Sequence, residues 1–258
     1  MKKVVLFDMD GTLTPPRKKM QWDVIDVLTD LQKHCEIGIV TGSDIDYVQQ
    51  QLDLIFDMSP IDCYGIHYLP CNGTKYYKLS GSGFKPIYEN NMRDYLIEDD
   101  WRRLMQLLTS LQSSVTRVHR NIPMTGNFIS YRGSMINWCP IGRHATHSDR
   151  EEWAALDKEQ NIRNNWLTLA RQGLNNICLS DIVIKLGGDT SFDIYPKGWD
   201  KTFAFKNFAG YEKIYFVGDR CDQNGNDREA YELAGDLGYK TSGPEQTIEI
   251  IKKIIEEQ

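Results

Sequence analysis

Two aspartates near the N-terminus are the first side chains in this sequence that could perform chemistry. Asp8 and Asp10 lie two residues apart, directly after the apolar residues 4–7. If the extended chain continues through them, both carboxylates project to the same side. Paired carboxylates repel each other and favour either a shared proton or a hard cation such as Mg²⁺. The pair therefore predicts acid–base or metal chemistry at the end of a strand.

Other polar groups follow similar apolar runs further along the chain. Thr41-Gly42-Ser43 follows one such run, and Asp219 follows another. Ligands in open α/β sheets bind at the carboxyl ends of strands, so we expect these groups to meet Asp8 there. The hydroxyls and amides of residues 41–43 could bind an anion at the start of a helix. Lys201 could neutralise a phosphate or an aspartyl group.

Each of these residues alone has a simpler interpretation. A D-x-D pair is common at solvated strand ends, and Thr41 or Ser43 could cap a helix. Asp222 and Asp227, which follow Asp219, could be surface turn residues. The ordered occurrence of all these groups after successive apolar runs favours a shared site.

The elements that must position these groups alternate between strand and helix. Residues 4–7, 37–40 and 214–217 are short all-apolar runs, which is typical of strands buried on both faces of a parallel sheet. Apolar residues at spacings of three and four predict helices over residues 22–34 and 245–257. This alternation predicts an α/β fold with a doubly wound parallel-sheet core.

The middle of the chain has a different pattern, which predicts an inserted α+β cap domain. Residues 80–83, with the sequence Ser-Gly-Ser-Gly, are a linker candidate, and residues 94–112 are expected to form a long amphipathic helix. Short alternating strands, which fit an antiparallel sheet, are expected at residues 127–132, 135–139, 181–185 and 191–195. The predicted division is core residues 1–81, cap residues 82–197 and core residues 198–258.

The expected cap strands carry groups that suit a phosphorylated ligand. Gly133-Ser134 predicts a two-residue hairpin loop, and the resulting register places Arg132 and Asn137 on one face. Ser191 and Asp193 share one face of the last expected strand.

Two further arginines follow this hairpin. Ser148 and Glu151 have the spacing of a capping box, so a helix is expected to begin there with Arg150 in its first turn. A positive side chain is mildly unfavourable at that end of a helix, which suggests that Arg150 serves an anion. Arg143 lies nearby, and planar guanidinium groups suit a phosphate.

The ordered set of acidic, hydroxyl and lysine residues resembles the haloacid dehalogenase superfamily of phosphotransferases. The resemblance implies that Asp8 is the nucleophile that attacks phosphorus and that Asp10 is the general acid and base. It also implies that Thr41 (or Ser43) and Lys201 stabilise the phosphoryl group. The Mg²⁺ ligands that it implies are Asp8, Asp10 and Asp219.

Longer strings in both parts of the chain resemble the eukaryotic-type phosphomannomutase family. They include residues 13–17, 126–132, 137–143, 157–163, 191–201 and 218–227. The resemblance implies interconversion of mannose 1-phosphate and mannose 6-phosphate for GDP-mannose synthesis, in a Mg²⁺-dependent homodimer formed through the cap. A hexose 1,6-bisphosphate would be the activator. The sugar-phosphate residues that it implies are Arg17, Arg132, Asn137, Arg143, Arg150, Ser191 and Asp193.

Some positions depart from the family pattern. Thr41 stands where the family usually has glycine, and Cys71 stands where it usually has glutamate. Threonine at position 41 is usual in phosphatases of the wider superfamily, so a capped sugar-phosphate phosphatase is the first alternative. A catalytically silent phosphosugar-binding protein is the second, and the intact Asp8, Asp10 and Asp219 count against it.

Charge and composition argue against several other classes of protein. The 258 residues carry a formal net charge of −6, whereas a general nucleic-acid binder needs a basic face. The sequence contains no apolar run of about 18 residues and no secretory signal pattern at its start. We therefore expect a cytoplasmic protein that binds a hexose phosphate rather than nucleic acid or membrane.

Overall fold

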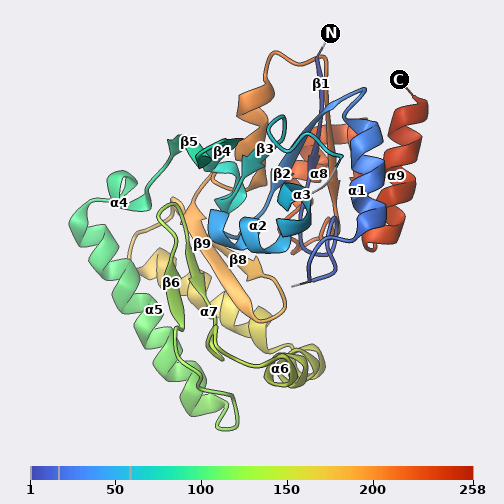
Figure 1. The fold of residues 1–258 in the computed structure, drawn as a ribbon. Helices are drawn as coiled ribbons and strands as arrows, with labels where there is room; N and C mark the ends of the chain where they lie inside the picture. The colour runs from blue at the N-terminus through green and yellow to red at the C-terminus, as the bar shows by residue number, and fades with distance from the viewer. Residues whose placement is uncertain (1, 17, 58–59, 258) are drawn as a thin grey trace. The chain divides into compact units, whose positions relative to one another are not determined.

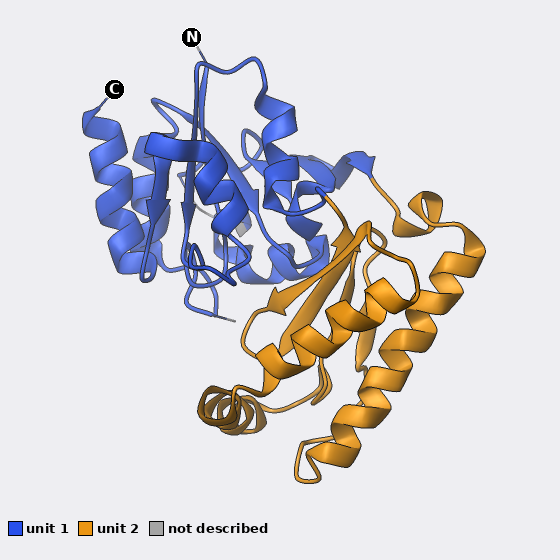
Figure 2. Cartoon of the chain, turned by 180° about the vertical axis from the view of Figure 1, so that it is seen from behind, with its two compact units in different colours: residues 1–89, 198–258 blue, residues 90–197 orange. Residues whose placement is uncertain are grey.

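The computed structural model describes residues 2–16, 18–57 and 60–257, which fold as two compact units. The core unit comprises residues 1–89 and 198–258, and the cap unit comprises residues 90–197 (Figure 2).

The core unit is built on a seven-stranded sheet with the order β11-β10-β1-β2-β3-β4-β5 (Figure 1). The strands from β11 to β3 pair in parallel, and β4 and β5 extend the sheet as an antiparallel hairpin. The bounds are β1 Lys3–Phe7, β2 Glu36–Val40, β3 His67–Leu69, β4 Lys75–Ser80, β5 Gly83–Glu89, β10 Lys213–Gly218 and β11 Gly238–Lys240. Phe7 of β1 lies beside Ile39 of β2 and Val217 of β10. This register brings the residues that follow these strands to one edge.

Helices cover both faces of the core sheet. They are α1 Trp22–Leu31, α2 Ile45–Gln51, α3 Asp53–Asp57, η1 Cys71–Gly73, η2 Lys201–Phe208, α8 Arg228–Ala234, η3 Gly235–Leu237 and α9 Pro244–Glu256. Val5 and Phe7 pack into an apolar cluster with α1 and α9, whereas Val4 and Leu6 pack with Phe208 on the opposite face. These four residues of β1 are fully buried, which confirms the predicted strand with two covered faces.

The predicted linker at residues 80–83 is wrong, because this stretch is the turn of the β4–β5 hairpin. Ser80 pairs directly with Gly83, and Gly83 has a φ of +98°, which glycine adopts without a steric penalty. Serine and glycine are favoured in hairpin turns as well as in linkers, so composition alone did not separate the two. The structure divides at Asn90 rather than at the predicted residue 82.

The cap unit contains a four-stranded antiparallel sheet with the order β6-β7-β9-β8. Its elements are α4 Met92–Tyr95, α5 Glu98–Val118, β6 Ile129–Tyr131, β7 Ile136–Trp138, α6 His147–Gln160, α7 Ile162–Asn176, β8 Ile182–Gly187 and β9 Ser191–Pro196. Ser130 pairs with Asn137, and Arg132 N donates to Met135 O, so Gly133–Ser134 is the predicted hairpin loop. Helix α7 packs on both α5 and β8. A parallel-sheet core with an inserted α+β unit confirms the predicted fold class.

Helix α6 begins at His147 and is capped by a different pair from the predicted one. The Thr146 hydroxyl accepts a hydrogen bond from Asp149 N at 3.2 Å, and the Asp149 carboxylate accepts one from Thr146 N at 2.8 Å. The predicted pair, Ser148 and Glu151, has the same spacing two residues later. The sequence therefore contains two pairs with the spacing of a capping box, and the helix uses the first pair.

None of the helices in the described part of the chain is both long enough and apolar enough to cross a membrane.

A polar network at the amino end of the core strands centres on Glu36. Its carboxylate accepts hydrogen bonds from His67 Nε2 at 2.8 Å and from Tyr211 Oη at 2.7 Å, and Lys2 Nζ lies 3.0 Å away. Burial alone raises the pKa of Glu36, but these hydrogen bonds, led by that of Tyr211, outweigh burial and lower the pKa to about 2. The ionised carboxylate therefore stabilises the folded core.

Replacing this carboxylate tests its contribution to stability. Because the pKa of Glu36 is depressed, its contribution is present above pH 4.5 and is lost as pH falls toward 2. Glu36→Gln is expected to lower the free energy of unfolding at pH 7 by about 1 kcal/mol, or roughly 2–4 °C in Tm, after allowance for solvent screening. The difference from the parent should shrink toward pH 2 in thermal melts. Glu249→Gln, at an exposed position of α9, is the matched control. A difference that does not change with pH would contradict this account.

Candidate active site

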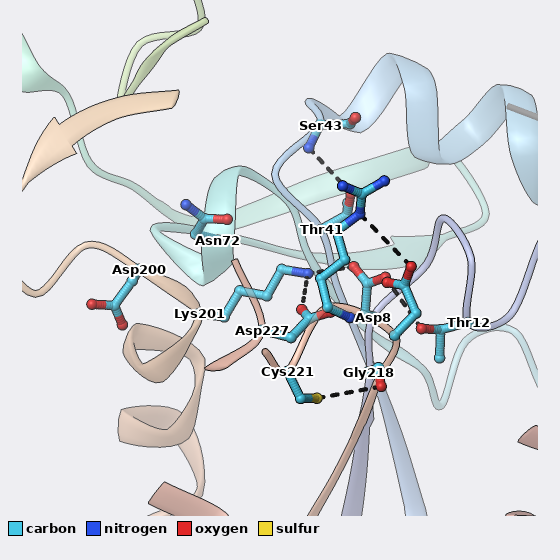
Figure 3. Close-up of polar contacts among 12 residues, drawn as sticks. Asp8, Thr12, Thr41, Ser43, Asn72, Asp200, Lys201, Gly218, Cys221 and Asp227 are labelled. Carbon is cyan, nitrogen blue, oxygen red and sulfur yellow. Dashed lines mark hydrogen bonds and ion pairs between the residues drawn. The ribbon is translucent and has the colours of Figure 1, made fainter. Parts of the chain in front are cut away.

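Three of the four predicted catalytic residues, Asp8, Thr41 and Lys201, lie near one another at the carboxyl edge of the core sheet (Figure 3). Asp8 follows β1, Thr41 follows β2, Asp219 follows β10, and Lys201 begins η2. Asp8 N donates to Val217 O at 2.9 Å, which continues the β1–β10 pairing one step beyond the strand. The site therefore follows from the parallel register of the central strands.

Lys201 is the centre of this site. Its side chain is 1% exposed, and Nζ donates to Asp8 Oδ1 and, at 2.5 Å, to Asp227 Oδ1. Figure 3 shows the lysine reaching between the two carboxylates. Thr12 Oγ1 donates to the second oxygen of Asp8 at 3.3 Å, and Arg220 N donates to the second oxygen of Asp227 at 2.9 Å. Both carboxylates are thus held through both of their oxygens.

The electrostatics of the site are dominated by an excess of buried negative charge. Burial raises the pKa of Asp8 well above its ordinary value, and the nearby Asp227 raises it further, whereas Lys201 acts in the opposite direction. Burial and then Asp227 also raise the pKa of Asp219, to about 6. Burial alone lowers the pKa of Lys201, but Asp227 and Asp8 outweigh it, so its pKa lies above the ordinary value. The lysine ammonium therefore offsets only part of the charge of three carboxylates.

These carboxylates fit a divalent cation. Asp8, Asp219 and Asp227 each offer an oxygen, and the three oxygens lie within 4.8 Å of one another. Oxygen donors in a buried, negatively charged setting suit Mg²⁺. Gly11 permits this approach, because a Cβ there would lie 2.5 Å from Asp219 Oδ2, and its φ of +85° also favours glycine.

The composition of this cluster differs from the predicted metal set, which had Asp10 where the structure has Asp227. Asp227 is fully buried and lies at the start of α8, so the interpretation as a surface turn residue is wrong. Asp227 comes eight residues after Asp219, in a loop whose path no periodicity predicts. The feature that could have identified Asp227 from the sequence is its position directly before a helix.

Asp10 lies in the turn that follows β1, and its carboxylate meets a different partner. Tyr47 Oη donates to Asp10 Oδ1 at 2.8 Å. Strand β1 ends at Phe7, and the amides of Thr12, Leu13 and Thr14 all donate to Met9 O. Asp10 therefore lies within a turn rather than in the extended chain that the sequence predicted.

Thr41 is buried beside the start of α2. Its Oγ1 accepts a hydrogen bond from Ser43 N at 3.1 Å, which shapes the loop that leads into the helix. The N-cap of α2 is Asp44, whose carboxylate accepts from Ile45 N at 2.8 Å. Asp44 therefore caps this helix, and neither Thr41 nor Ser43 is its N-cap residue.

The predicted sugar-phosphate residues of the cap form a second cluster. Asn137 Nδ2 donates to Asp193 Oδ1 at 2.7 Å and to Ser191 Oγ at 3.0 Å, and Arg143 Nη1 donates to Asn137 Oδ1 at 2.8 Å. Gly187 lies against this cluster, because a Cβ there would lie 2.6 Å from the Asp193 carboxyl group. The structure thus brings these four predicted residues together.

The remaining three arginines of the predicted set differ from one another. Arg132 lies at the β6–β7 hairpin, where its N donates to Met135 O at 2.8 Å. Arg17 lies outside the described residues. Arg150 is buried on α6, and its guanidinium donates to Arg143 O at 2.7 Å, Ala145 O at 3.1 Å and Thr190 Oγ1 at 2.8 Å. These acceptors offset the cost of a positive charge at the helix start without requiring an anion, so a phosphate at Arg150 stays a prediction.

Sequence comparison relates this chain to known proteins over nearly its whole length. A family model described as eukaryotic phosphomannomutase matches residues 24–257. A phosphomannomutase of Dendrobium officinale is 32% identical over 250 residues, which cover 96% of this chain and 92% of that protein. A phosphomannomutase of Schizosaccharomyces pombe is 31% identical over 256 residues, which cover 98% of this chain and 94% of that protein.

Solved structures with lower identity share the fold. The IMP-bound, N-terminally truncated IMP-nucleotidase of Plasmodium falciparum has a TM-score of 0.67 at 16% identity, covering 99% of this chain and 68% of that one. A trehalose-6-phosphate phosphatase related protein has a TM-score of 0.52 at 15% identity, covering 98% and 97%. These likenesses concern the fold alone, whereas the family match extends through both units. The chain belongs to the eukaryotic phosphomannomutase family.

Proposed function

We propose that this protein is a phosphomannomutase that interconverts mannose 1-phosphate and mannose 6-phosphate. The route runs through an aspartyl-phosphate on Asp8 and a hexose 1,6-bisphosphate. The observation that carries the proposal is the buried contact of Asp8 with Lys201 beside two further carboxylates. A carboxylate that accepts a phosphoryl group needs a fixed position and nearby positive charge, and this arrangement supplies both.

The core residues divide the chemistry between them. Asp8 forms a bond to phosphorus while the bond from phosphorus to the sugar oxygen breaks. Asp10 donates a proton to that departing oxygen, and in the return transfer it accepts a proton from the attacking sugar hydroxyl. Lys201 and the Thr41 loop contact the phosphoryl oxygens. Mg²⁺ held by Asp8, Asp219 and Asp227 would add positive charge at those oxygens.

The cap cluster is proposed to bind the rest of the substrate. Arg143, together with Arg132, suits the phosphate that is not reacting, because a guanidinium binds phosphate through two parallel hydrogen bonds. Asp193 and Ser191 suit sugar hydroxyls, and Asn137 links them to Arg143. Transfer of the phosphoryl group from Asp8 to a hydroxyl of the sugar monophosphate gives the bisphosphate. The bisphosphate then reorients, and its other phosphate is transferred back to Asp8.

The cellular setting of this reaction is also part of the proposal. We infer a cytoplasmic homodimer that associates through the cap and supplies mannose 1-phosphate for GDP-mannose synthesis. These inferences rest on the family to which the chain belongs.

The alternative function is a sugar-phosphate phosphatase that uses the same nucleophile. Thr41 favours it, since its hydroxyl stands at a position where the family usually has glycine. Water would then replace the sugar hydroxyl as the acceptor of the phosphoryl group.

Phosphorus NMR separates these functions. With Mg²⁺ and a trace of glucose 1,6-bisphosphate, mannose 1-phosphate is expected to be converted to mannose 6-phosphate. Asp8→Asn should reduce conversion by at least about 10³-fold, because the nucleophile is lost. Release of inorganic phosphate alone would contradict the proposal and favour the phosphatase. No change in the spectrum would favour a binding protein.

Calorimetric titration with Mg²⁺ tests the metal cluster. Asp219→Asn is expected to weaken Mg²⁺ binding more than tenfold, because it removes one of three converging oxygens. The metal-free variant should be at least as stable as the parent at pH 7, since Asp219 is a half-buried carboxylate whose pKa is raised to about 6.

The control for this titration is Asp222→Asn in the same loop. The Asp222 side chain is 80% exposed and pairs with Lys240, so its loss should leave Mg²⁺ affinity unchanged. Equal affinities in the parent and in Asp219→Asn would exclude Asp219 as a ligand.

A further inference from the structure

The side chain of Tyr47 links helix α2 to the turn that carries Asp10. Its hydroxyl donates to Asp10 Oδ1 at 2.8 Å, although the two residues are 37 positions apart in the sequence. The Tyr47 ring is partly buried against the apolar cluster of the core, so the hydroxyl extends from a packed ring. Packing of the ring against the core therefore holds the Tyr47 hydroxyl in place.

The backbone that carries Tyr47 is fixed as well. Tyr47 lies in the first turn of α2, whose N-cap residue is Asp44. Lys75 Nζ lies 3.0 Å from both oxygens of the Asp44 carboxylate, and Lys75 is buried. This ion pair, in which Lys75 is buried and Asp44 is half-buried, ties the start of α2 to β4 and so supports the helix turn that carries Tyr47.

Asp10 needs such a support because of where it lies in the chain. It follows the end of β1 and precedes Gly11, at the point where the chain leaves the sheet. Asp8, two residues earlier, is fixed by Lys201 and Thr12. A general acid contributes about 10²–10⁴-fold to a rate, and a misplacement of about 1 Å can cost about 10²-fold.

We propose that Tyr47 is a positioning residue that orients the carboxylate of Asp10 for proton transfer to and from the sugar oxygen. The inference rests on the proposed function and names a residue that supports its acid–base step. The hydrogen bond from the Tyr47 hydroxyl to Oδ1 fixes the orientation of this carboxylate. Tyr47 itself contacts neither substrate nor phosphorus.

This role can be tested by comparing the rates of phosphoryl transfer from two donors, because only one of their leaving groups needs a proton. Transfer from glucose 1,6-bisphosphate to Asp8 breaks the bond between phosphorus and a sugar oxygen, which departs with a proton from Asp10. Transfer from acetyl phosphate to Asp8 breaks a bond to an acetate oxygen, and acetate departs without a proton. A defect in the position of the acid therefore slows the first transfer and leaves the second nearly unchanged.

The experiment measures phosphorylation of the full-length protein by each donor, labelled with phosphorus-32, in rapid-quench mixing with Mg²⁺. Tyr47→Phe is expected to slow transfer from glucose 1,6-bisphosphate by about 10–100-fold and transfer from acetyl phosphate by less than about 3-fold. Tyr64→Phe, at a tyrosine of the core unit that is 56% exposed, should change neither rate.

A second variant keeps the test decisive. If Tyr47 acts through Asp10, Tyr47→Phe should add less than about 2-fold to the loss in an Asp10→Asn background. Equal slowing with both donors, or full additivity with Asp10→Asn, would overturn the inference and indicate a merely structural role. Failure of the parent protein to accept phosphate from either donor would instead refute the proposed function.

Discussion

The buried ammonium of Lys201 between Asp8 and Asp227 is the interaction on which the site depends. Loss of one partner from a buried ion pair leaves an uncompensated charge and costs about 3–5 kcal/mol, so all three groups must arrive together. Asp8 comes from the end of β1, Lys201 from the first turn of η2, and Asp227 from the start of α8. The parallel register of the core strands and the path of the loops that follow them are both required to bring these groups into contact.

One ammonium group does not neutralise the three carboxylates that lie at this site. Burial and the neighbouring Asp227 raise the pKa of Asp8, which opposes the ionised form that a nucleophile needs. Lys201 counters this effect, and a divalent cation on the three converging oxygens would complete the compensation. The site therefore carries an excess of negative charge that a bound divalent cation would offset. Asp10, the proposed acid–base residue, is not part of this charge cluster, and its carboxylate accepts a hydrogen bond from Tyr47.

Sequence patterns predicted what local periodicity determines. The all-apolar run of β1 predicted a doubly covered strand, and the glycine–serine loop predicted the hairpin that pairs Ser130 with Asn137. Contacts made by loops were not predictable, because no periodicity relates Asp227 to Lys201 or Tyr47 to Asp10. Predictions were also wrong where one sequence pattern is compatible with two local structures. The Ser-Gly-Ser-Gly stretch is a turn rather than a linker, and the capping box of α6 lies two residues before the predicted one.

Asp8 is proposed to carry the phosphoryl group during the reaction, and borohydride trapping tests this assignment. Borohydride reduces an acyl phosphate to the alcohol, so an aspartyl-phosphate becomes homoserine. The protein would be incubated with Mg²⁺ and glucose 1,6-bisphosphate, reduced, digested and sequenced by tandem mass spectrometry. We predict homoserine at position 8. Homoserine at another carboxylate, or formation of mannose 6-phosphate with no homoserine at position 8, would contradict the account.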